Sequence, residues 1–307
     1  MAITIIIDKS TFQSLNFDEL YRLSCYYTHI ITPVLVLEIL GDLKKEYPEG
    51  KSPPEERVKD FANKLFPMES IVNMHYKFLV RGDLLGDQIT MDGRPIVGTQ
   101  NTYLSSSGQQ GFLVAETEEE KAIYNWKDGK FSEADKQLSS LWRMTTTNEE
   151  VTRRLKDTLS TSVSMKIANF NELNELVTTS LNNQAIQQTL LVAFFQNYDI
   201  NAATAIRILQ RWQIEGKPLI KDFAPYAYHC LRIDTFFLFG LASGLIGTRP
   251  TNRVDLEYLY YIPFSNIFTS NDKVHKNLIP FLLQSYQKFI AGSELKEDLK
   301  NIVVNFS

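Results

Sequence analysis

The sequence contains little cysteine: Cys25 and Cys230 are the only two in 307 residues, and neither has a second thiol or an imidazole at ligand spacing. A disulfide framework and a structural zinc site are therefore not supported, and a reducing cytoplasm is the expected compartment. Glycine-rich phosphate loops of the forms GxxxxGK and GxGxxG are also missing. Their absence removes the two commonest nucleotide-binding loops as explanations of function.

Long apolar runs are missing as well. The longest, from residue 235 to 247, is too short to span a bilayer, and the apolar N-terminal run has no basic region before it. We therefore expect neither a signal segment nor a membrane partner. The net charge is −4, so the chain has no overall positive field. Any contact with nucleic acid must come from a local basic patch.

Strands and helices alternate in the first 45 residues. The β-branched run Ile3 to Ile7 predicts a buried parallel strand that ends at Asp8. The segments that follow are predicted to be a helix from about residue 10 to Tyr27, a strand from His29 to Ile31, and a helix from Val34 to Lys44 that begins after a Thr-Pro cap. This order predicts the α/β class, with a Rossmann-like parallel sheet as the core.

The chain changes character at residue 46. From 46 to 199 it is charged and rich in Asn, Gln and Ser, which predicts a large, mainly helical insertion between two parts of the core, residues 1–45 and 200–307. Inside it, an Asp-Gly pair at residues 92 and 93 predicts a small hairpin from Gln88 to Val97.

The C-terminal part returns to the core pattern. Asn252 to Tyr261 is predicted to be a helix that carries Asp255, and Asn266 to Thr269 a strand that leads into Ser270 and Asp272. A last helix is predicted from about Leu278 to Ile290.

Four acidic residues stand where such a sheet binds ligands, outside the carboxyl ends of its strands. Asp8 and Asp272 follow predicted strands, whereas Glu38 and Asp255 lie on the adjoining helices. Oxygen-only ligands suit Mg²⁺ or Mn²⁺. Taken singly, each acid also has a structural interpretation: a helix cap, an exposed helix residue, or an acid favoured by the helix dipole.

The motifs ITIIID, TPVLVLEIL, VDLEYLYY and IFTSNDK, which carry these acids, resemble those of the PIN-domain family. The resemblance covers residues 1–45 and about 225–307, and the long insertion departs from compact members. It implies a PIN-like core that cleaves phosphodiester bonds, usually of RNA, with metal-activated water. It also implies Asp8, Glu38 and Asp255 as metal ligands, with Asp272 or the Ser270 hydroxyl completing the site.

Basic and polar groups flank the acids and could form the cationic rim that an anionic substrate needs. We expect substrate contacts from Ser270, Lys273, Arg253 and His275. The leading hypothesis is a Mg²⁺- or Mn²⁺-dependent endoribonuclease. One alternative is an inactive PIN-like scaffold that binds a protein partner through residues 46–199, which the acidic net charge favours. Phosphatase or nucleotide-processing chemistry on a similar sheet is a third possibility.

Overall fold

The core of the protein is a five-stranded sheet in which all strands run parallel. In the computed structural model, which describes residues 3–45, 52–65, 70–98, 102–106, 109–113, 116–162 and 167–302, the strand order is β3-β2-β1-β6-β7. The strands are β1 (Ile3–Ile7), β2 (Tyr27–Ile31), β3 (Ser70–Val72), β6 (Ile267–Ser270) and β7 (Lys288–Ala291). The predicted α/β class with a parallel sheet is confirmed.

The chain winds outward from β1 in both directions, so the strand order reverses between β1 and β6. Ile5 of β1 pairs with Ile267 of β6, and Ile7 pairs with Thr269. The isoleucines of β1 from Ile5 to Ile7 are fully buried, as expected for a central strand covered on both faces. The carboxyl ends of β1 and β6 therefore flank the point where open α/β sheets bind ligands.

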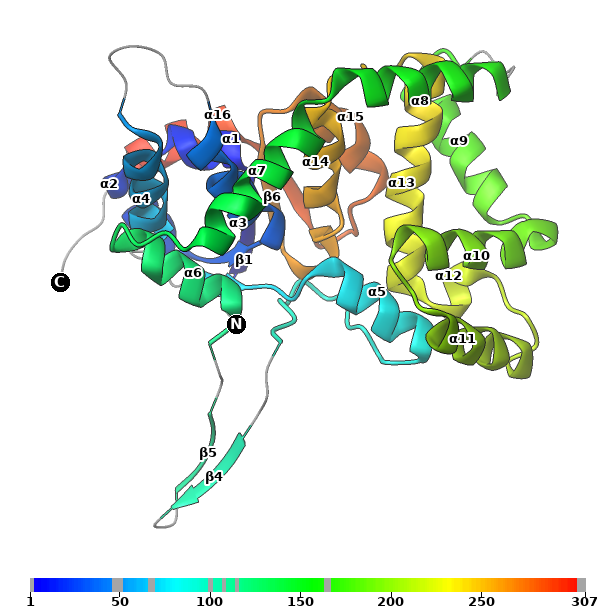
Figure 1. Ribbon diagram of the computed structural model, residues 1–307, viewed down its shortest axis with the longest axis horizontal. Coiled ribbons are helices and arrows are strands. Elements are labelled where there is room, and N and C mark those ends of the chain that lie inside the picture. Colours follow the sequence, from blue (N-terminus) through cyan, green and yellow to red (C-terminus); the bar gives the residue numbers. More distant parts are fainter. Residues whose placement is uncertain are drawn as a thin grey trace.

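Two halves can be distinguished around this sheet (Figure 1). The sheet half carries α1 (Lys9–Ser14), α2 (Phe17–Ser24), α3 (Pro33–Gly41), η1 (Asp42–Lys44), α4 (Pro54–Leu65), α6 (Glu118–Lys127), α14 (Thr251–Leu259), η3 (Ile262–Phe264), α15 (Lys273–Leu278), η4 (Ile279–Phe281) and α16 (Gly292–Asn301). The helical half contains α5 (Tyr76–Leu85), α8 (Glu149–Ser162), α9 (Phe170–Leu181), η2 (Gln184–Ile186), α10 (Gln187–Asn197), α11 (Ala202–Ile214), α12 (Ile220–Phe223) and the buried α13 (Pro225–Ser243). Helix α7 (Glu133–Thr147) runs between them. None of the helices described is long and apolar enough to cross a membrane.

Two predicted helices were wrong. The segment after Asp8 forms α1 and α2 rather than one helix to Tyr27, because Asn16 and Glu19 form a capping box that starts a new helix. The helix predicted from Leu278 to Ile290 is replaced by η4 and the edge strand β7, and the last helix, α16, lies beyond it.

The segment 46–199 is mainly helical, but it also supplies part of the sheet. Strand β3 pairs with β2, so the sheet extends into the predicted insertion. The hairpin predicted from Gln88 to Val97 does not form, because Ile96 instead exchanges hydrogen bonds with Asn73 and Met74 just after β3. An antiparallel pair forms later in the chain, between β4 (Thr102–Ser106) and β5 (Gln109–Leu113).

Candidate active site

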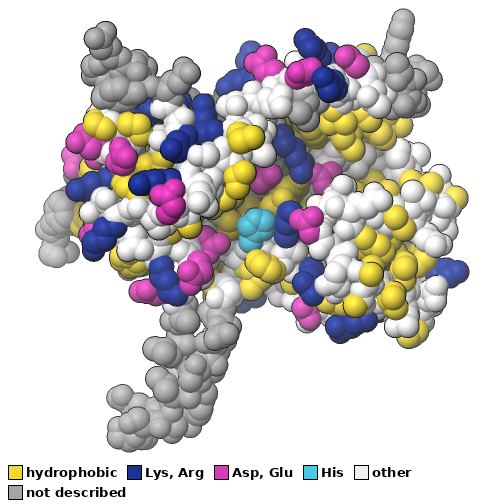
Figure 2. Space-filling model, in the orientation of Figure 1, with side chains coloured by type: hydrophobic (Ala, Val, Ile, Leu, Met, Phe, Trp, Pro, Cys, Tyr) yellow, Lys and Arg dark blue, Asp and Glu magenta, His cyan; other side chains and the backbone are white. Residues whose placement is uncertain are grey.

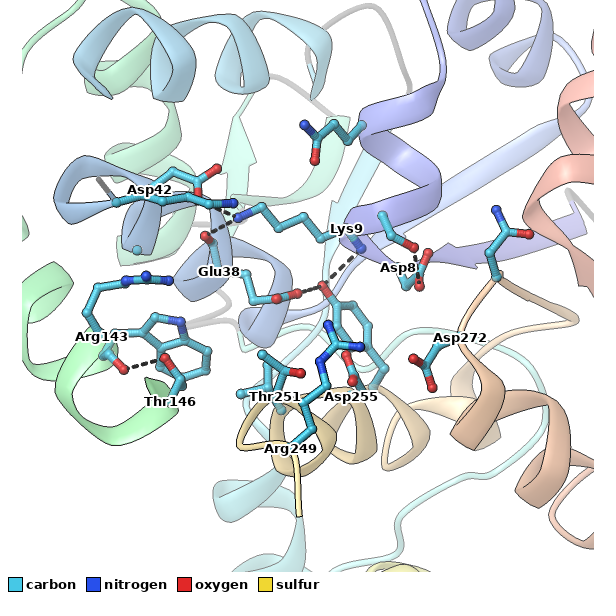
Figure 3. Close-up of a pocket in the computed structure, with 18 residues that line it drawn as sticks. Asp8, Lys9, Glu38, Asp42, Arg143, Thr146, Arg249, Thr251, Asp255 and Asp272 are labelled. Carbon is cyan, nitrogen blue, oxygen red and sulfur yellow. Dashed lines mark hydrogen bonds and ion pairs between the residues drawn. The ribbon is translucent and has the colours of Figure 1, made fainter. Parts of the chain in front are cut away.

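A cavity of about 400 Å³ opens at the carboxyl ends of β1 and β6. All four acids predicted from the sequence line it: Asp8, Glu38, Asp255 and Asp272. Figure 3 shows their carboxylates around one space, although they come from the end of β1, from α3, from α14 and from the turn after β6. The predicted convergence of acids from distant parts of the chain is therefore present.

Asp8 is the most firmly held of the four acids. Its side chain is buried and accepts hydrogen bonds from Thr11 N at 2.9 Å, Ser10 Oγ at 2.9 Å and Ser270 Oγ at 2.7 Å. The bond from Thr11 makes Asp8 the N-cap of α1. The structural interpretation of this residue is thus correct, and it does not remove the carboxylate from the cavity.

Glu38 is held by a tyrosine from another helix. The hydroxyl of Tyr258 on α14 donates to Glu38 Oε2 at 2.5 Å and accepts from Lys9 N at 3.3 Å. Burial raises the pKa of Glu38, and the nearby Lys9 ammonium and the Tyr258 hydrogen bond oppose that increase. Glu38 is consequently a carboxylate in an apolar setting with one strong donor, as its leucine-rich surroundings in the sequence indicated.

Asp255 and Asp272 form the other side of the acid group. Burial raises the pKa of Asp255 to about 8, and the negative charges of Asp272, Glu38 and Asp8 raise it further. Asp272 caps α15 by accepting from Val274 N at 2.6 Å and His275 N at 3.4 Å. Burial and the three neighbouring carboxylates therefore disfavour the ionised form of Asp255.

Ser270 and His275 tie the ends of three elements together. Ser270 Oγ accepts from Asp272 N at 2.9 Å and lies 2.7 Å from His275 Nδ1, while His275 Nε2 lies 2.5 Å from the backbone oxygen of Asp255. Both side chains are fully buried. The expectation that they contact substrate is therefore corrected: they are positioning residues that fix Asp8 and the Asp255 backbone.

The other two predicted substrate contacts do not line this cavity. Arg253 binds Asp234 Oδ1 at 2.7 Å and the Tyr260 hydroxyl at 3.0 Å, and it faces a neighbouring cavity. Lys273 is exposed and lies outside the set of lining residues. Arg253 lies two positions before Asp255 on α14, so the two side chains leave the helix on different faces.

Positive charge reaches the cavity from other positions. Asp42, buried on η1, pairs with Lys9 Nζ at 2.9 Å and Arg57 at 3.4 Å, and Lys45 lies 4.0 Å away. One carboxylate therefore faces three cations. Lys45 lines the cavity, together with Arg143 of α7 and Arg249. Figure 2 shows a hollow between the two halves with acidic and basic side chains around it.

The sequence interpretation missed Tyr258, Asp42 and α7. Tyr258 is three positions after Asp255, and Asp42 is four positions after Glu38, so each shares a helix face with a predicted ligand and could have been found by spacing. Trp142, Arg143 and Thr146 of α7 also line the cavity. No local pattern marks them, because their place depends on how α7 packs.

The acid group suits a hard divalent cation in its chemistry and charge. All four donors are carboxylate oxygens, and their mutual repulsion would be relieved by positive charge. Their present spacing is looser: across the residues described, no three His, Cys, Asp or Glu side chains are grouped closely enough to hold one ion. Searches against protein-family models, curated proteins and solved structures found no match to the chain.

Proposed function

We propose that the protein is a metal-dependent endoribonuclease with a Rossmann-like core of the PIN type. The observation that carries the proposal is the convergence of Asp8, Glu38, Asp255 and Asp272 on one cavity at the reversal point of a parallel sheet. The cations at the same cavity add support, because a phosphodiester substrate is an anion. Neither feature alone singles out a nuclease, but the pairing of acids with cations suits phosphoryl chemistry.

In this proposal the four acids hold one or two Mg²⁺ or Mn²⁺ ions. When bound, the metal supplies Lewis-acid activation of water and neutralises charge on the phosphate. Tyr258 holds Glu38 in place, and the pair Ser270 and His275 does the same for Asp8 and the Asp255 backbone. Arg249, Lys45 and Arg143 offer donors to the phosphate oxygens.

The test is cleavage of an end-labelled single-stranded RNA by the purified chain with Mn²⁺. Cleavage should stop with EDTA and fall more than about 100-fold in Asp8→Asn. Asp18→Asn, which changes an exposed acid on α2, is the matched control and should cleave normally. Full activity of Asp8→Asn would refute the assignment, and hydrolysis of a phosphomonoester but not RNA would favour a phosphatase.

A second candidate is a scaffold that binds a protein partner through the 46–199 segment. It is favoured by an apolar stripe on the outer face of α7, where Leu138, Leu141 and Met144 are 44%, 58% and 70% exposed. Deleting the segment is no test, because β3 would be lost with it. If the chain is such a scaffold, it should show no metal-dependent cleavage. Its association with the protein partner, measured by light scattering, should be abolished by Leu141→Asp and unchanged by Asp8→Asn.

A further inference from the structure

Helix α7 closes one side of the carboxylate cavity by packing against α3. The contact depends on Gly41: a Cβ atom there would lie 2.5 Å from Cδ1 of Trp142. Gly41 has an ordinary helical φ of −57°, which any residue adopts, and glycine is a poor helix former. The glycine is therefore explained by the room that the Trp142 indole needs, rather than by backbone conformation.

Trp142 differs from the other two tryptophans of the chain. Trp126 and Trp212 are 1% and 4% exposed and belong to the core, whereas Trp142 is only partly buried and lines the cavity. The indole is thus an aromatic surface available to a ligand in the site. Bases of nucleic acids stack on such surfaces with little dependence on sequence.

Charge is distributed unevenly around the same space. Figure 3 shows Arg143 on the side of the cavity away from Asp8 and Asp272, and Arg249 near Asp255. The Arg143 guanidinium on one side and the carboxylates of Asp8 and Asp272 on the other would orient a phosphate-bearing ligand. At about 400 Å³ the cavity is near the lower end of ligand sites and has the size of one nucleotide unit rather than of a base pair.

We propose that α7 is the recognition element of the site, with Trp142 as the stacking surface for one unpaired base and Arg143 as a contact to its phosphate. This inference rests on the proposed function of the acid group. It identifies the part of the substrate that α7 recognises. The bound unit belongs to a single strand, whose next phosphodiester lies toward the four carboxylates. A base held in a duplex has neither face free for Trp142.

The test is a calorimetric binding titration of the full chain carrying Asp255→Asn, to suppress cleavage, with four probes. These are an adenosine octaribonucleotide, an abasic octamer, a blunt octamer duplex and free AMP. The single strand should bind roughly ten-fold to a hundred-fold tighter than the abasic strand or the duplex. Trp142→Ala should reduce binding of the single strand to the abasic level, while Trp142→Phe keeps most of it.

Two further variants guard against a folding artefact. Gly41→Ala keeps Trp142 but should push its indole out of position. This variant should therefore also lose the preference for the base-containing strand. Leu141→Ala, on the exposed outer face of α7, should bind like its parent. Equal affinity for base-containing and abasic strands, a preference for duplex, or free AMP bound as tightly as the strand would overturn the inference. Trp142-dependent binding without any cleavage by the unmodified chain would overturn only the proposed nuclease activity.

Discussion

The two sides of the carboxylate cavity are built in different ways. The acidic wall, which comprises Asp8, Glu38, Asp255 and Asp272, is fixed by buried and part-buried hydrogen bonds that link the ends of β1 and β6 with α3, α14 and α15. The basic wall, which comprises Lys45 and Arg143, rests on the packing of η1 and α7 and is more exposed. Rigid carboxylates suit metal binding, whereas adaptable cations suit a substrate that must enter and leave.

Asp255→Asn is expected to have the largest effect on stability, because it removes a charge from the acidic wall. The pKa of Asp255 is higher in the folded protein, about 8, than in the unfolded chain, about 4. The folded state therefore binds this proton more tightly, and the free energy of unfolding falls as pH rises from 4 through 8. At pH 7 without metal, Asp255→Asn should stabilise the protein by about 4 kcal/mol in urea unfolding.

The pH dependence provides the control for that prediction. The parent should lose stability between pH 4 and pH 8, whereas Asp255→Asn should show a flatter profile over the same range. Saturating Mn²⁺ should recover stability in the parent and have much less effect on the variant. A variant less stable than its parent at pH 7, with an unchanged profile, would show that Asp255 is not an uncompensated carboxylate.

His275→Ala should be the next largest change and of opposite sign. It leaves the Asp255 backbone oxygen and Ser270 without their buried partner, which should cost about 3 kcal/mol of unfolding free energy. Lys276→Ala, the exposed neighbour, is the control. Equal stability of the two variants would contradict the hydrogen-bonded account of the acidic wall.

Gly41→Ala tests the packing of α7 with a smaller effect. The added methyl group must displace the Trp142 indole, while alanine improves helix propensity. A net loss of about 1 kcal/mol is expected, with a red-shift of the tryptophan emission of the folded protein. Gly216→Ala is unsuitable as a control because its φ is +84°, so Ser140→Ala on α7, a partly buried position whose hydroxyl bonds only within the helix, serves instead. A Gly41→Ala variant whose emission is not red-shifted relative to Ser140→Ala would mean that Trp142 does not pack on Gly41.

Lys45→Ala should change stability least, by less than about 0.5 kcal/mol. Its side chain is 47% exposed, and Asp42 keeps the closer cations Lys9 and Arg57. The affinity for RNA should nevertheless fall and should depend less on salt concentration. Binding titrations between 50 and 200 mM salt should show a slope smaller by about one released counterion. A stability loss as large as that of His275→Ala would erase the distinction between the two walls.

Local signals account for the parts of the fold that the sequence predicted. Strand β1 is a continuous run of buried isoleucines, and Thr32 and Pro33 mark the start of α3 in both pattern and structure. Convergence of the acids followed from the rule that parallel strands bring their carboxyl ends to one edge. Strand β7 was missed because it is short and only partly buried, so it lacks the apolar run that identified β1.

The rest of the site depends on contacts between distant residues. The break between α1 and α2 had a local cause, the Asn16 capping box, and was open to prediction. In contrast, the place of α7 follows from the fit of Trp142 against Gly41, about a hundred positions earlier in the chain. Arg253 illustrates the same limit, because its partner Asp234 lies on α13 and draws it into the neighbouring cavity.

The central claim is that the four carboxylates hold a divalent cation, and crystals grown with Mn²⁺ test it directly through anomalous scattering. We expect a strong anomalous peak in the cavity, within about 2.0–2.6 Å of oxygens from Asp8 and at least one of Glu38, Asp255 and Asp272. A map at saturating Mn²⁺ with no peak between these residues, or with its only peak elsewhere on the surface, would contradict the claim.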